Sequence, residues 1–539
     1  MIGWGRVLRG CAVAVLIVGL CGSWIGPETY TVRAADPGIS ALVVPVGPSA
    51  GLTGLRLSGA SLVWQDTGGV FGVNLASGKP LPISASGGAQ PDVTAQFVAY
   101  RQGATGVSLL DLTTGGAAAI PVGDATAAVN GVAVSEAGVV AWLAQDSGGS
   151  VVKTWDRSTG AVSEAGRIPT ERAMGESLGT PRASGRRVVF PDITAAPARL
   201  SRFIVYNLDD GSRTAINDAF GGTPIYDFRV GRLVVAQNTR IAIFDLDTNA
   251  VEVFNILAPP GQKVTSIATD GANVVYSTGT AVYGYDIARK VGYTLATSRA
   301  NITSVAVSGA AIIWSEKGTL IGRLVSFPDN APPIVVRTDY QYFPQTGYIT
   351  GYTFLRYWLG NGGAAIFGYP LTNDTVDSAS KLVVQYFERS RFESHPENVG
   401  TGTVVQLTNV GRIVTAGRTD ASFVPQPLVP QGADRTYFVQ TQHALQGAIK
   451  SYFERNGGVT VFGYPISEET IEPNPTDGLV YTVQYFERAR FELHPEITDS
   501  PNGIQLGQLG RQILQGQIGL YRPECTPQYI QKPILPECK

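Results

Sequence analysis

The chain has 539 residues, with 41 Lys and Arg against 43 Asp and Glu, so its formal net charge is −2. No basic or acidic block stands out, which argues against a nucleic-acid-binding surface and against a cation store. Hydrophobic residues make up 44% of the chain, and its 64 Gly and 33 Pro are spread along it. This composition favours many short strands joined by turns over disorder, and the length allows several domains.

The N-terminal region has the features of an export signal. Arg6 and Arg9 precede the apolar segment 11–20, which is too short for a comfortable membrane span. Small residues in the stretch 32–36 offer a cleavage site. We therefore predict a signal peptide over residues 1–34 and an extracellular or cell-surface location. The long distance from the apolar segment to that site leaves an uncleaved membrane anchor as an alternative.

Seven copies of a short motif come next, each with a turn residue, then β-branched residues, and then usually an aromatic. The copies end 36 to 48 residues apart, at Trp64, Tyr100, Trp142, Phe190, Ala236, Tyr276 and Trp314. A second strand and a Gly, Asn or Asp turn follow most copies. Repeats of about 40 residues with four strands each are typical of β-propellers. We predict an all-β propeller over residues 36–326, with six or seven blades and seven favoured, and a possible closing strand at 41–46.

The rhythm of these copies, "G-x-x-V-V-aromatic … Y-D-L-x-x-G", resembles that of the TolB-type β-propellers over about half of the chain. That resemblance implies a propeller that binds proteins, peptides or glycans on one face, although some relatives are enzymes. Residues 40–330 contain no His and no Cys, which removes most nucleophile–base chemistry from this part. The stretch "DLDTN" at 245–249 lacks the Gly and Glu of a calcium loop, so we expect a hairpin turn there.

A Pro-containing linker is expected at 327–339, followed by two similar stretches at 340–425 and 435–518. In the second stretch, five residues fall on one helical face: Leu445, Ala448, Ile449, Tyr452 and Phe453. The Gly pair at 457–458 should end that helix. Two short strands, "VQYF" and "RFELH", should flank a turn at 487–489. We therefore predict two small α+β repeat modules after the propeller.

Both modules resemble LGFP-type repeats. The matching residues are Phe367-Gly368-Tyr369-Pro370 and Gln385-Tyr386-Phe387-Glu388 in the first copy, and Phe462-Gly463-Tyr464-Pro465 and Gln484-Tyr485-Phe486-Glu487 in the second. The resemblance implies an exported bacterial protein held to the cell wall, or a non-catalytic accessory module. Two features depart from the family pattern, namely the longer period of 95 to 99 residues and the "HPE" that ends the second motif.

The sequence "QYFERSRFESHPE" at 385–397 returns almost unchanged as "QYFERARFELHPE" at 484–496. Its carboxylates and His could form an acid/base pair or a zinc site, at Glu388, Glu393, His395 and Glu397 and again at Glu487, Glu492, His494 and Glu496. The neighbouring Arg residues would instead pair with these carboxylates and keep them ionised. We favour that structural interpretation, because a duplicated catalytic site within one chain is uncommon.

A ligand-binding role for the modules remains open, because aromatic rings can stack on sugars as well as pack in a core. The candidates are Trp358, Tyr369, Tyr386, Tyr464, Tyr485, His395 and His494. We expect no catalytic residue, no metal and no cofactor. In the Pro-rich tail 519–539, Cys525 and Cys538 are expected to form a disulfide in an exported chain, with two free thiols as the alternative.

Together these features predict an exported binding protein, and we favour a non-enzymatic one. Its propeller would present a recognition face to a protein or glycan, and its modules would attach to cell wall or extracellular polysaccharide. Contact with a membrane is expected only if the signal is not cleaved. Two alternatives remain, a propeller-type glycoside hydrolase or lyase and an interaction hub in a surface assembly.

Overall fold

The computed structural model describes residues 38–517, apart from 45, 48–50, 84–87, 124–126, 170–175, 194–199, 222–223, 299–300, 327–336, 400, 402, 429–433, 475–478 and 498–502. The predicted signal peptide and the Cys525–Cys538 pair lie outside the described residues. Within the described part, no helix is long and apolar enough to cross a membrane.

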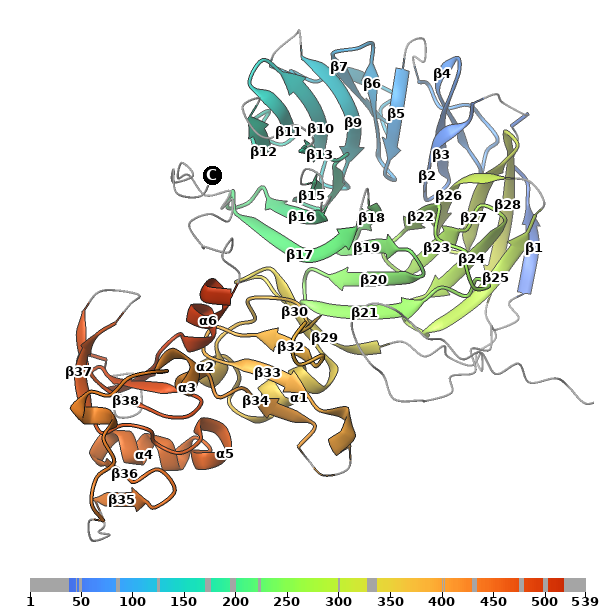
Figure 1. Cartoon of the computed structure of the whole chain (residues 1–539). Helices are drawn as coiled ribbons and strands as arrows, with labels where there is room; N and C mark the ends of the chain where they lie inside the picture. The colour runs from blue at the N-terminus through green and yellow to red at the C-terminus, as the bar shows by residue number, and fades with distance from the viewer. Residues whose placement is uncertain are drawn as a thin grey trace, which may run out of the picture.

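The first part of the chain forms antiparallel sheets that stand side by side in a ring, which is the architecture of a β-propeller (Figure 1). The strands of these sheets, among the residues described, are β2–β4 (Thr53–Ser58, Ser61–Asp66, Gly69–Asn74), β5–β8 (Gly88–Val93, Phe97–Gln102, Gly106–Asp111, Ala117–Ala119), β9–β12 (Ala128–Val134, Val139–Asp146, Gly149–Asp156, Val162–Pro169), β13–β17 (Ser177–Leu178, Arg182–Ser184, Arg187–Ile193, Leu200–Asn207, Arg213–Gly221), β18–β21 (Ile225–Arg229, Arg232–Gln237, Arg240–Asp245, Ala250–Asn255), β22–β25 (Ser266–Thr269, Asn273–Ser277, Ala281–Asp286, Val291–Thr297) and β26–β28 (Ile302–Ser308, Ala311–Glu316, Thr319–Ser326) with β1 (Gly38–Leu42).

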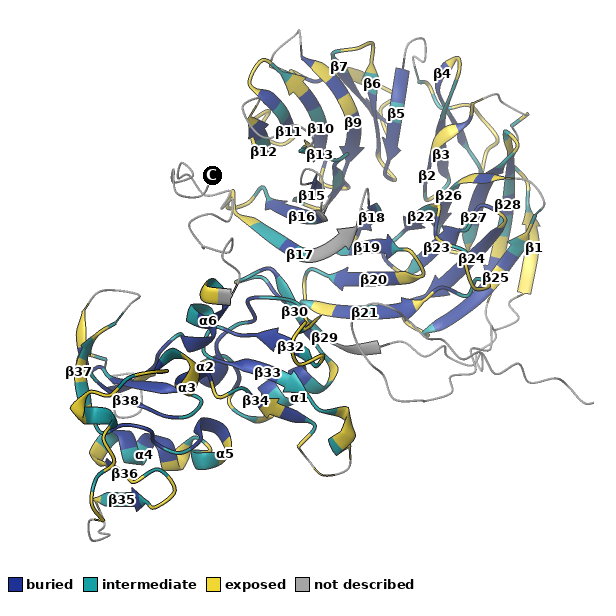
Figure 2. Ribbon diagram, in the orientation of Figure 1, coloured by how far each residue is buried: buried dark blue, intermediate teal, exposed yellow. Residues whose placement is uncertain are grey.

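The motif aromatics form the core between neighbouring sheets. Trp142 on β10 is fully buried and packs against Phe97 and Leu109 of the preceding sheet. Trp314 on β27 packs in the same way against Val275. Successive residues of a strand point to opposite faces of its sheet. Each inner strand therefore contributes side chains to the core shared with the preceding sheet and to the core shared with the next sheet. The β-branched residues that precede each aromatic are therefore buried as well, as Figure 2 shows for the ring.

The copy that ends at Ala236 is out of register with the others. The turn before β19 is Val230-Gly231, whereas the turns before β3 and β27 begin with Gly59 and Gly309. Aligned by their turns, Val235 takes the aromatic position and packs toward the preceding sheet, while Ala236 faces the next one. A one-residue shift exchanges the two faces of a strand, so the position expected from sequence was off by one.

The ring is closed by the earliest strand of the described chain. Strand β1 runs antiparallel to β28, with Gly38 opposite Ser326 and Leu42 opposite Gly322. It therefore supplies the outer strand of the last sheet, slightly earlier than the expected 41–46. Side chains also tie one sheet to the next, because Ser308 Oγ accepts a 2.9 Å hydrogen bond from the Gly59 backbone N–H.

The two C-terminal repeats share one order of elements: a hairpin, two short helices, a four-stranded sheet and a final helix. Repeat 1 contains β29 (Arg337–Phe343), β30 (Tyr348–Gly351), α1 (Tyr352–Gly360), α2 (Gly363–Phe367), β31 (Thr375–Val376), β32 (Val383–Tyr386), β33 (Arg391–Ser394), η1 (Pro396–Asn398), β34 (Val405–Leu407) and α3 (Val410–Val414). The turn η2 (Ala421–Phe423) follows. Repeat 2 contains β35 (Arg435–Phe438), β36 (His443–Gln446), α4 (Gly447–Arg455), α5 (Gly458–Phe462), β37 (Thr470–Pro473), β38 (Val480–Tyr485), β39 (Arg490–Leu493), β40 (Ile504–Leu506) and α6 (Leu509–Gln517).

The predicted helix of repeat 2 is shorter than its apolar pattern. Helix α4 begins at Gly447, so Leu445 lies in β36 instead. The apolar spacing extends back to Leu445, before the start of the helix, because Leu445 is buried in the same core as Ile449. As expected, the helix ends at Arg455, and Gly457 then adopts the left-handed conformation with φ 105°.

Repeat 1 is joined to the propeller by strand addition. Strand β29 pairs with β21, the outer strand of its sheet, and β30 follows, which makes a six-stranded sheet. The Asn217 backbone N–H also donates a 2.6 Å hydrogen bond to the Gly347 carbonyl. A Cβ on Gly347 would collide with the Ala215 carbonyl, so only Gly allows this approach. Strand β29 begins at Arg337, inside the segment expected to be a linker.

Candidate functional site

The duplicated motif forms a hairpin in each repeat, as the sequence predicted. Strands β32 and β33 pair with Val384 opposite Glu393, and β38 and β39 pair with Val483 opposite Glu492. Gln385 is completely buried, and its side-chain NH₂ donates 2.8 Å hydrogen bonds to the carbonyls of Ile349 and Thr372. The amide therefore holds the hairpin to the rest of its repeat.

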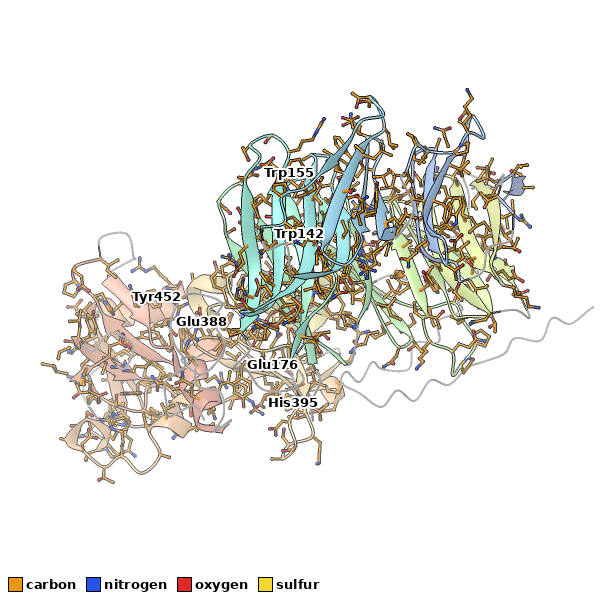
Figure 3. All side chains as sticks on the ribbon, turned by 90° about the horizontal axis from the view of Figure 1, so that it is seen from above. Trp142, Trp155, Glu176, Glu388, His395 and Tyr452 are labelled. Carbon is orange, nitrogen blue, oxygen red and sulfur yellow. The ribbon has the colours of Figure 1, made fainter. Side chains whose placement is uncertain are left out.

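The first Glu of each motif secures the Phe-Gly-Tyr-Pro turn. One carboxylate oxygen of Glu388, which is labelled in Figure 3, accepts a 3.1 Å hydrogen bond from the Tyr369 backbone N–H. In repeat 2, Glu487 accepts the same bond from Tyr464 at 3.1 Å. Gly368 lies beneath Glu388 with φ +73°, and a Cβ there would stand 2.5 Å from the Glu388 Cβ. These Glu residues therefore position the backbone.

The same Glu residues also fasten the two repeats together. The Arg511 guanidinium lies 3.0 Å from the second Glu388 carboxylate oxygen, and Arg412 lies 2.7 Å from that of Glu487. The Arg511 backbone N–H donates to the Glu388 carbonyl at 3.0 Å, and the Gly411 backbone N–H donates to the Glu487 carbonyl at 2.9 Å. Each repeat thus gives its last helix to the hairpin turn of the other, which is a reciprocal, pseudo-two-fold contact. We call this contact the inter-repeat lock.

The remaining charged residues of the motif form a row on one face of a strand. Arg391, Glu393 and His395 alternate along β33 and its end, and residues two apart share a face. Arg391 lies 2.7 Å from Glu393, and the His395 Nδ1 lies 2.8 Å from Glu397. Repeat 2 has the same row, with Arg490 2.8 Å from Glu492 and His494 Nδ1 2.9 Å from Glu496.

The two rows differ in their exposure. Arg490, Glu492 and His494 are all buried, and His494 also stacks on Tyr481 with ring centroids 3.8 Å apart. His395 is only half-buried. Within the described ranges, no group of His, Cys, Asp and Glu has the arrangement of a metal site. The geometry fits ion pairs that brace a hairpin.

The aromatic candidates occupy two kinds of position. Trp358 is buried, and its indole N–H donates a 2.9 Å hydrogen bond to the Gly368 carbonyl. Tyr386 and Tyr485 are also buried, and the Tyr485 hydroxyl donates to Glu472 at 2.8 Å. Burial raises the pKa of Tyr485 to about 12. Tyr369 and Tyr464 are only half-buried.

The two half-buried rings each have an aromatic neighbour beneath. Tyr369 packs on Phe343 with centroids 6.0 Å apart, and Tyr464 packs on Phe438 with centroids 5.8 Å apart. Both follow a positive-φ glycine in the Phe-Gly-Tyr-Pro turn. These rings are therefore the members of the predicted set that combine a supported position with accessible surface.

The propeller contains a charged cluster that the sequence analysis did not identify. Five residues from inner strands of four sheets meet at the ring axis: Arg56, Asp92, Arg182, Asp227 and Arg229. We call them the axial cluster. They come from strands far apart in the chain, so the local sequence gives little indication of the cluster. The clearest sequence signal is a charged residue within an otherwise buried inner strand.

Ion pairs cross the ring axis within the axial cluster. Arg229 pairs with Asp92 and also donates a 3.0 Å hydrogen bond to the Val134 carbonyl. Arg56 lies 3.7 Å from Asp92 and 3.5 Å from Asp227. Burial alone would raise the pKa of Asp227, but Arg56, Arg182 and Arg229 together lower it below its usual value. The Asp227 carboxyl is therefore held ionised.

The axial carboxylates also join neighbouring sheets. Asp92 accepts a 2.9 Å hydrogen bond from the Val134 N–H, and Asp227 accepts one of 3.0 Å from the Thr269 N–H. Each Asp thus bonds the inner strand of the next sheet. These bonds link neighbouring sheets around the ring, and the five residues carry a positive excess of one charge.

Comparisons with known proteins give the fold alone. No known family matches the chain, and no curated protein sequence does. Among solved structures, a streptogramin B lyase is 12% identical, with 55% of this chain and 100% of that chain covered and a TM-score of 0.41. The β-propeller domain of the Trilobed protease from Pyrococcus furiosus is 14% identical, with 53% and 100% covered and a TM-score of 0.38. BamB from Moraxella catarrhalis is 13% identical, with 51% and 85% covered and a TM-score of 0.33.

Proposed function

We propose that this protein is an exported bacterial binding protein without enzymatic activity. Its propeller, of TolB type with one blade for each of the seven described sheets, presents a recognition face to a protein or glycan. Its two LGFP-like repeats attach to cell wall or extracellular polysaccharide. The disulfide between Cys525 and Cys538 and the cleaved signal belong to the same proposal.

The main support for a protein without enzymatic activity is that the charged residues of the duplicated motif already have partners within the fold. In both copies, the Glu residues that resemble an acid/base pair contact an Arg, a His or a backbone N–H of the same fold. A catalytic carboxyl group must be able to reach the substrate. These carboxylates are instead engaged in contacts within their own repeat or with the other repeat.

The axial cluster supports the same conclusion for the propeller. A glycoside hydrolase mechanism with two carboxyl groups requires one of them to give up a proton to the leaving group. Asp227 has a lowered pKa, and both axial Asp residues bond a neighbouring sheet. The hydrolase or lyase alternative is therefore less well supported than binding.

Within the repeats, the proposal places sugar contacts at Tyr369 and Tyr464. The other aromatic candidates are buried, and the His395 Nδ1 is paired with Glu397. Aromatic rings bind sugars through their apolar faces. An aromatic ring that is supported from below and half-exposed above suits that role.

The test is co-sedimentation of the full chain with purified cell walls and insoluble polysaccharides. The double variant Tyr369→Leu, Tyr464→Leu should pellet much less than the parent, while Leu359→Ser, at an exposed position on α1, should pellet equally. The full chain is needed because β29 belongs to the propeller sheet. If the parent does not pellet, polysaccharide attachment is wrong. Turnover of synthetic glycosides that His395→Ala and His494→Ala abolish would instead establish an enzyme.

A further inference from the structure

The axial cluster contains a charged side chain whose hydrogen-bonding capacity the fold does not use. Arg56 on β2 lies 3.5 Å from Asp227 and 3.7 Å from Asp92, and the described residues give its guanidinium no hydrogen bond. A guanidinium has five N–H donors, and polar groups that are largely withdrawn from water normally have acceptors. The donors of Arg56 are therefore available to a further oxygen atom.

Arg182 is held in a fixed orientation, and part of its guanidinium is also unused. One terminal N–H donates a 3.1 Å hydrogen bond to the Pro181 carbonyl, and the guanidinium carbon lies 5.7 Å from the centroid of the Tyr226 ring. The buried Nε lies 3.2 Å from Asp227 Oδ1, yet within the described part of the chain neither atom makes a hydrogen bond. These contacts position the group without saturating it.

The two guanidinium groups converge on one oxygen atom. Asp227 Oδ1 lies 3.5 Å from the Arg56 Nη1 and 3.2 Å from the Arg182 Nε, so a single oxyanion can contact both side chains. Burial, and after it the charge of Arg182, lower the pKa of Arg56. A further negative group beside both guanidinium groups would therefore stabilise their charged forms.

Water reaches the positive side chains of this group more than the negative ones. The Arg56 and Arg182 side chains are 14% and 16% exposed, whereas those of Asp92 and Asp227 are 1% and 3% exposed. The accessible part of the axial cluster is therefore positive. An anion that approaches it meets guanidinium groups, while the carboxylates stay behind them.

The size of the charge excess indicates which anion fits. The five residues carry one positive charge in excess. Glu136 also acts on Arg229, but it is exposed, where solvent screens its charge, and it accepts a 3.2 Å hydrogen bond from the Gly185 N–H. A carboxylate has one negative charge and two oxygens that match the guanidinium fork. A phosphate monoester has about two charges near neutral pH and would leave a negative excess.

We propose that the propeller binds a carboxylate group of its ligand in the axial cluster, between Arg56 and Arg182. Strands β2, β5 and β18, which carry four of the five residues, border the centre of the ring (Figure 1). This inference rests on the proposed recognition role of the propeller and gives it a ligand class. The carboxylate belongs either to a free small acid or to a Glu side chain of a partner protein, and the experiment separates these two sources.

Isothermal titration calorimetry on the full chain at low ionic strength tests the proposal with four probes. Propionate represents a free acid, and the blocked tripeptide acetyl-Gly-Glu-Gly-amide represents a protein side chain. The matching Gln tripeptide and inorganic phosphate are the controls. We expect at least one carboxylate probe to bind saturably at one site, and to bind more tightly than either control. Binding of propionate would show that a free acid suffices, whereas binding of the Glu tripeptide alone would indicate a partner protein.

Three variants locate the bound carboxylate. Arg56→Gln removes a charged donor and should weaken binding at least about tenfold. Arg240→Gln removes the same charge at an exposed position of the propeller and should bind as the parent does. Arg56→Lys keeps the charge but lacks the planar fork, so it should bind at least about threefold more weakly than the parent. This last variant also supplies the comparison if Arg56→Gln folds poorly in calorimetry.

Several results would overturn the proposal. They are the absence of saturable binding by both carboxylate probes, equal affinity in the parent and the Arg56 variants, and tighter binding of phosphate than of either carboxylate probe. Polysaccharide attachment is measured separately, and Arg56→Gln should pellet with polysaccharide as the parent does. Failure of attachment and failure of carboxylate binding are therefore distinguishable.

Discussion

Gly368 and Gly463 show how a single residue can couple two parts of a repeat. Both have a positive φ, +73° and +74°, and both lie under the Glu that accepts the bond from the following Tyr. A side chain at either position meets backbone strain and a steric clash together. The "Phe-Gly-Tyr-Pro" and "Gln-Tyr-Phe-Glu" segments therefore appear together in each repeat, because the Glu of the second segment holds the backbone turn of the first.

Gly368→Ala should destabilise repeat 1 by about 1–3 kcal/mol, the usual cost of such strain. Hydrogen–deuterium exchange is the suitable measurement, because a multi-domain chain lacks a single unfolding free energy. Protection should fall in β32 and β33. The control is Gly360→Ala on α1, where no atom lies within 4 Å and φ is not positive. Equal protection in both variants would contradict the role assigned to Gly368.

At the scale of elements, the inter-repeat lock explains why the motif is duplicated so closely. Each hairpin turn receives the last helix of the other repeat, so a change in one copy alters a surface that the other copy must match. The buried Phe387 and Phe392 of repeat 1 share one core with Phe486 and Phe491 of repeat 2. The two repeats are therefore one folded body built from two copies.

Gly510→Ala should loosen this lock. A Cβ at Gly510 would collide with the Phe387 carbonyl across the interface, whereas Gly516 on the same helix has open space around it. Gly516→Ala should be neutral or slightly stabilising, because Ala favours helix over Gly by up to about 1 kcal/mol. Limited proteolysis between the repeats, at 418–428, should be faster for Gly510→Ala alone. Equal rates for the two variants would mean that the repeats do not depend on this contact.

The sequence predicted elements well and their partners poorly. The hairpin around 487–489 and the end of α4 followed from local patterns of strand residues and glycine. Strand β29 did not, because its pairing with β21 joins residues nearly a hundred positions apart. The same holds for Arg229 and Asp92, whose contact across the ring axis depends on the closed ring. Buried Trp358 was named as a ligand candidate since its type suits both sugar stacking and a core.

At the scale of the whole molecule, the first and last sheets of the propeller ring must be held together by non-covalent contacts, because no peptide bond joins them. Strand β1 closes it at the rim by pairing with β28, and the axial cluster connects distant sheets at the centre. Three Arg and two Asp are withdrawn from water there, which is costly unless every charge has partners. The ring geometry provides those partners, so the cluster specifies a closed arrangement more than it adds net stability.

Arg229→Met therefore tests the closed ring. It leaves Asp92 with the hydrogen bond from the Val134 N–H and with the more distant charge of Arg56 at 3.7 Å. Removal of one member of a buried pair typically costs about 3–5 kcal/mol. We expect the propeller transition in calorimetry to move to lower temperature, with the repeats largely unaffected. The control is Arg289→Met, because the Arg289 side chain is half-exposed and its pair with the buried Asp286 is screened by solvent on the Arg side, so its loss should cost less. The double variant Arg229→Met, Asp92→Leu should recover much of the loss, because no unpaired charge then remains from this pair. If the single and double variants are equally unstable, packing of the Arg229 side chain, and not its charge, holds the ring.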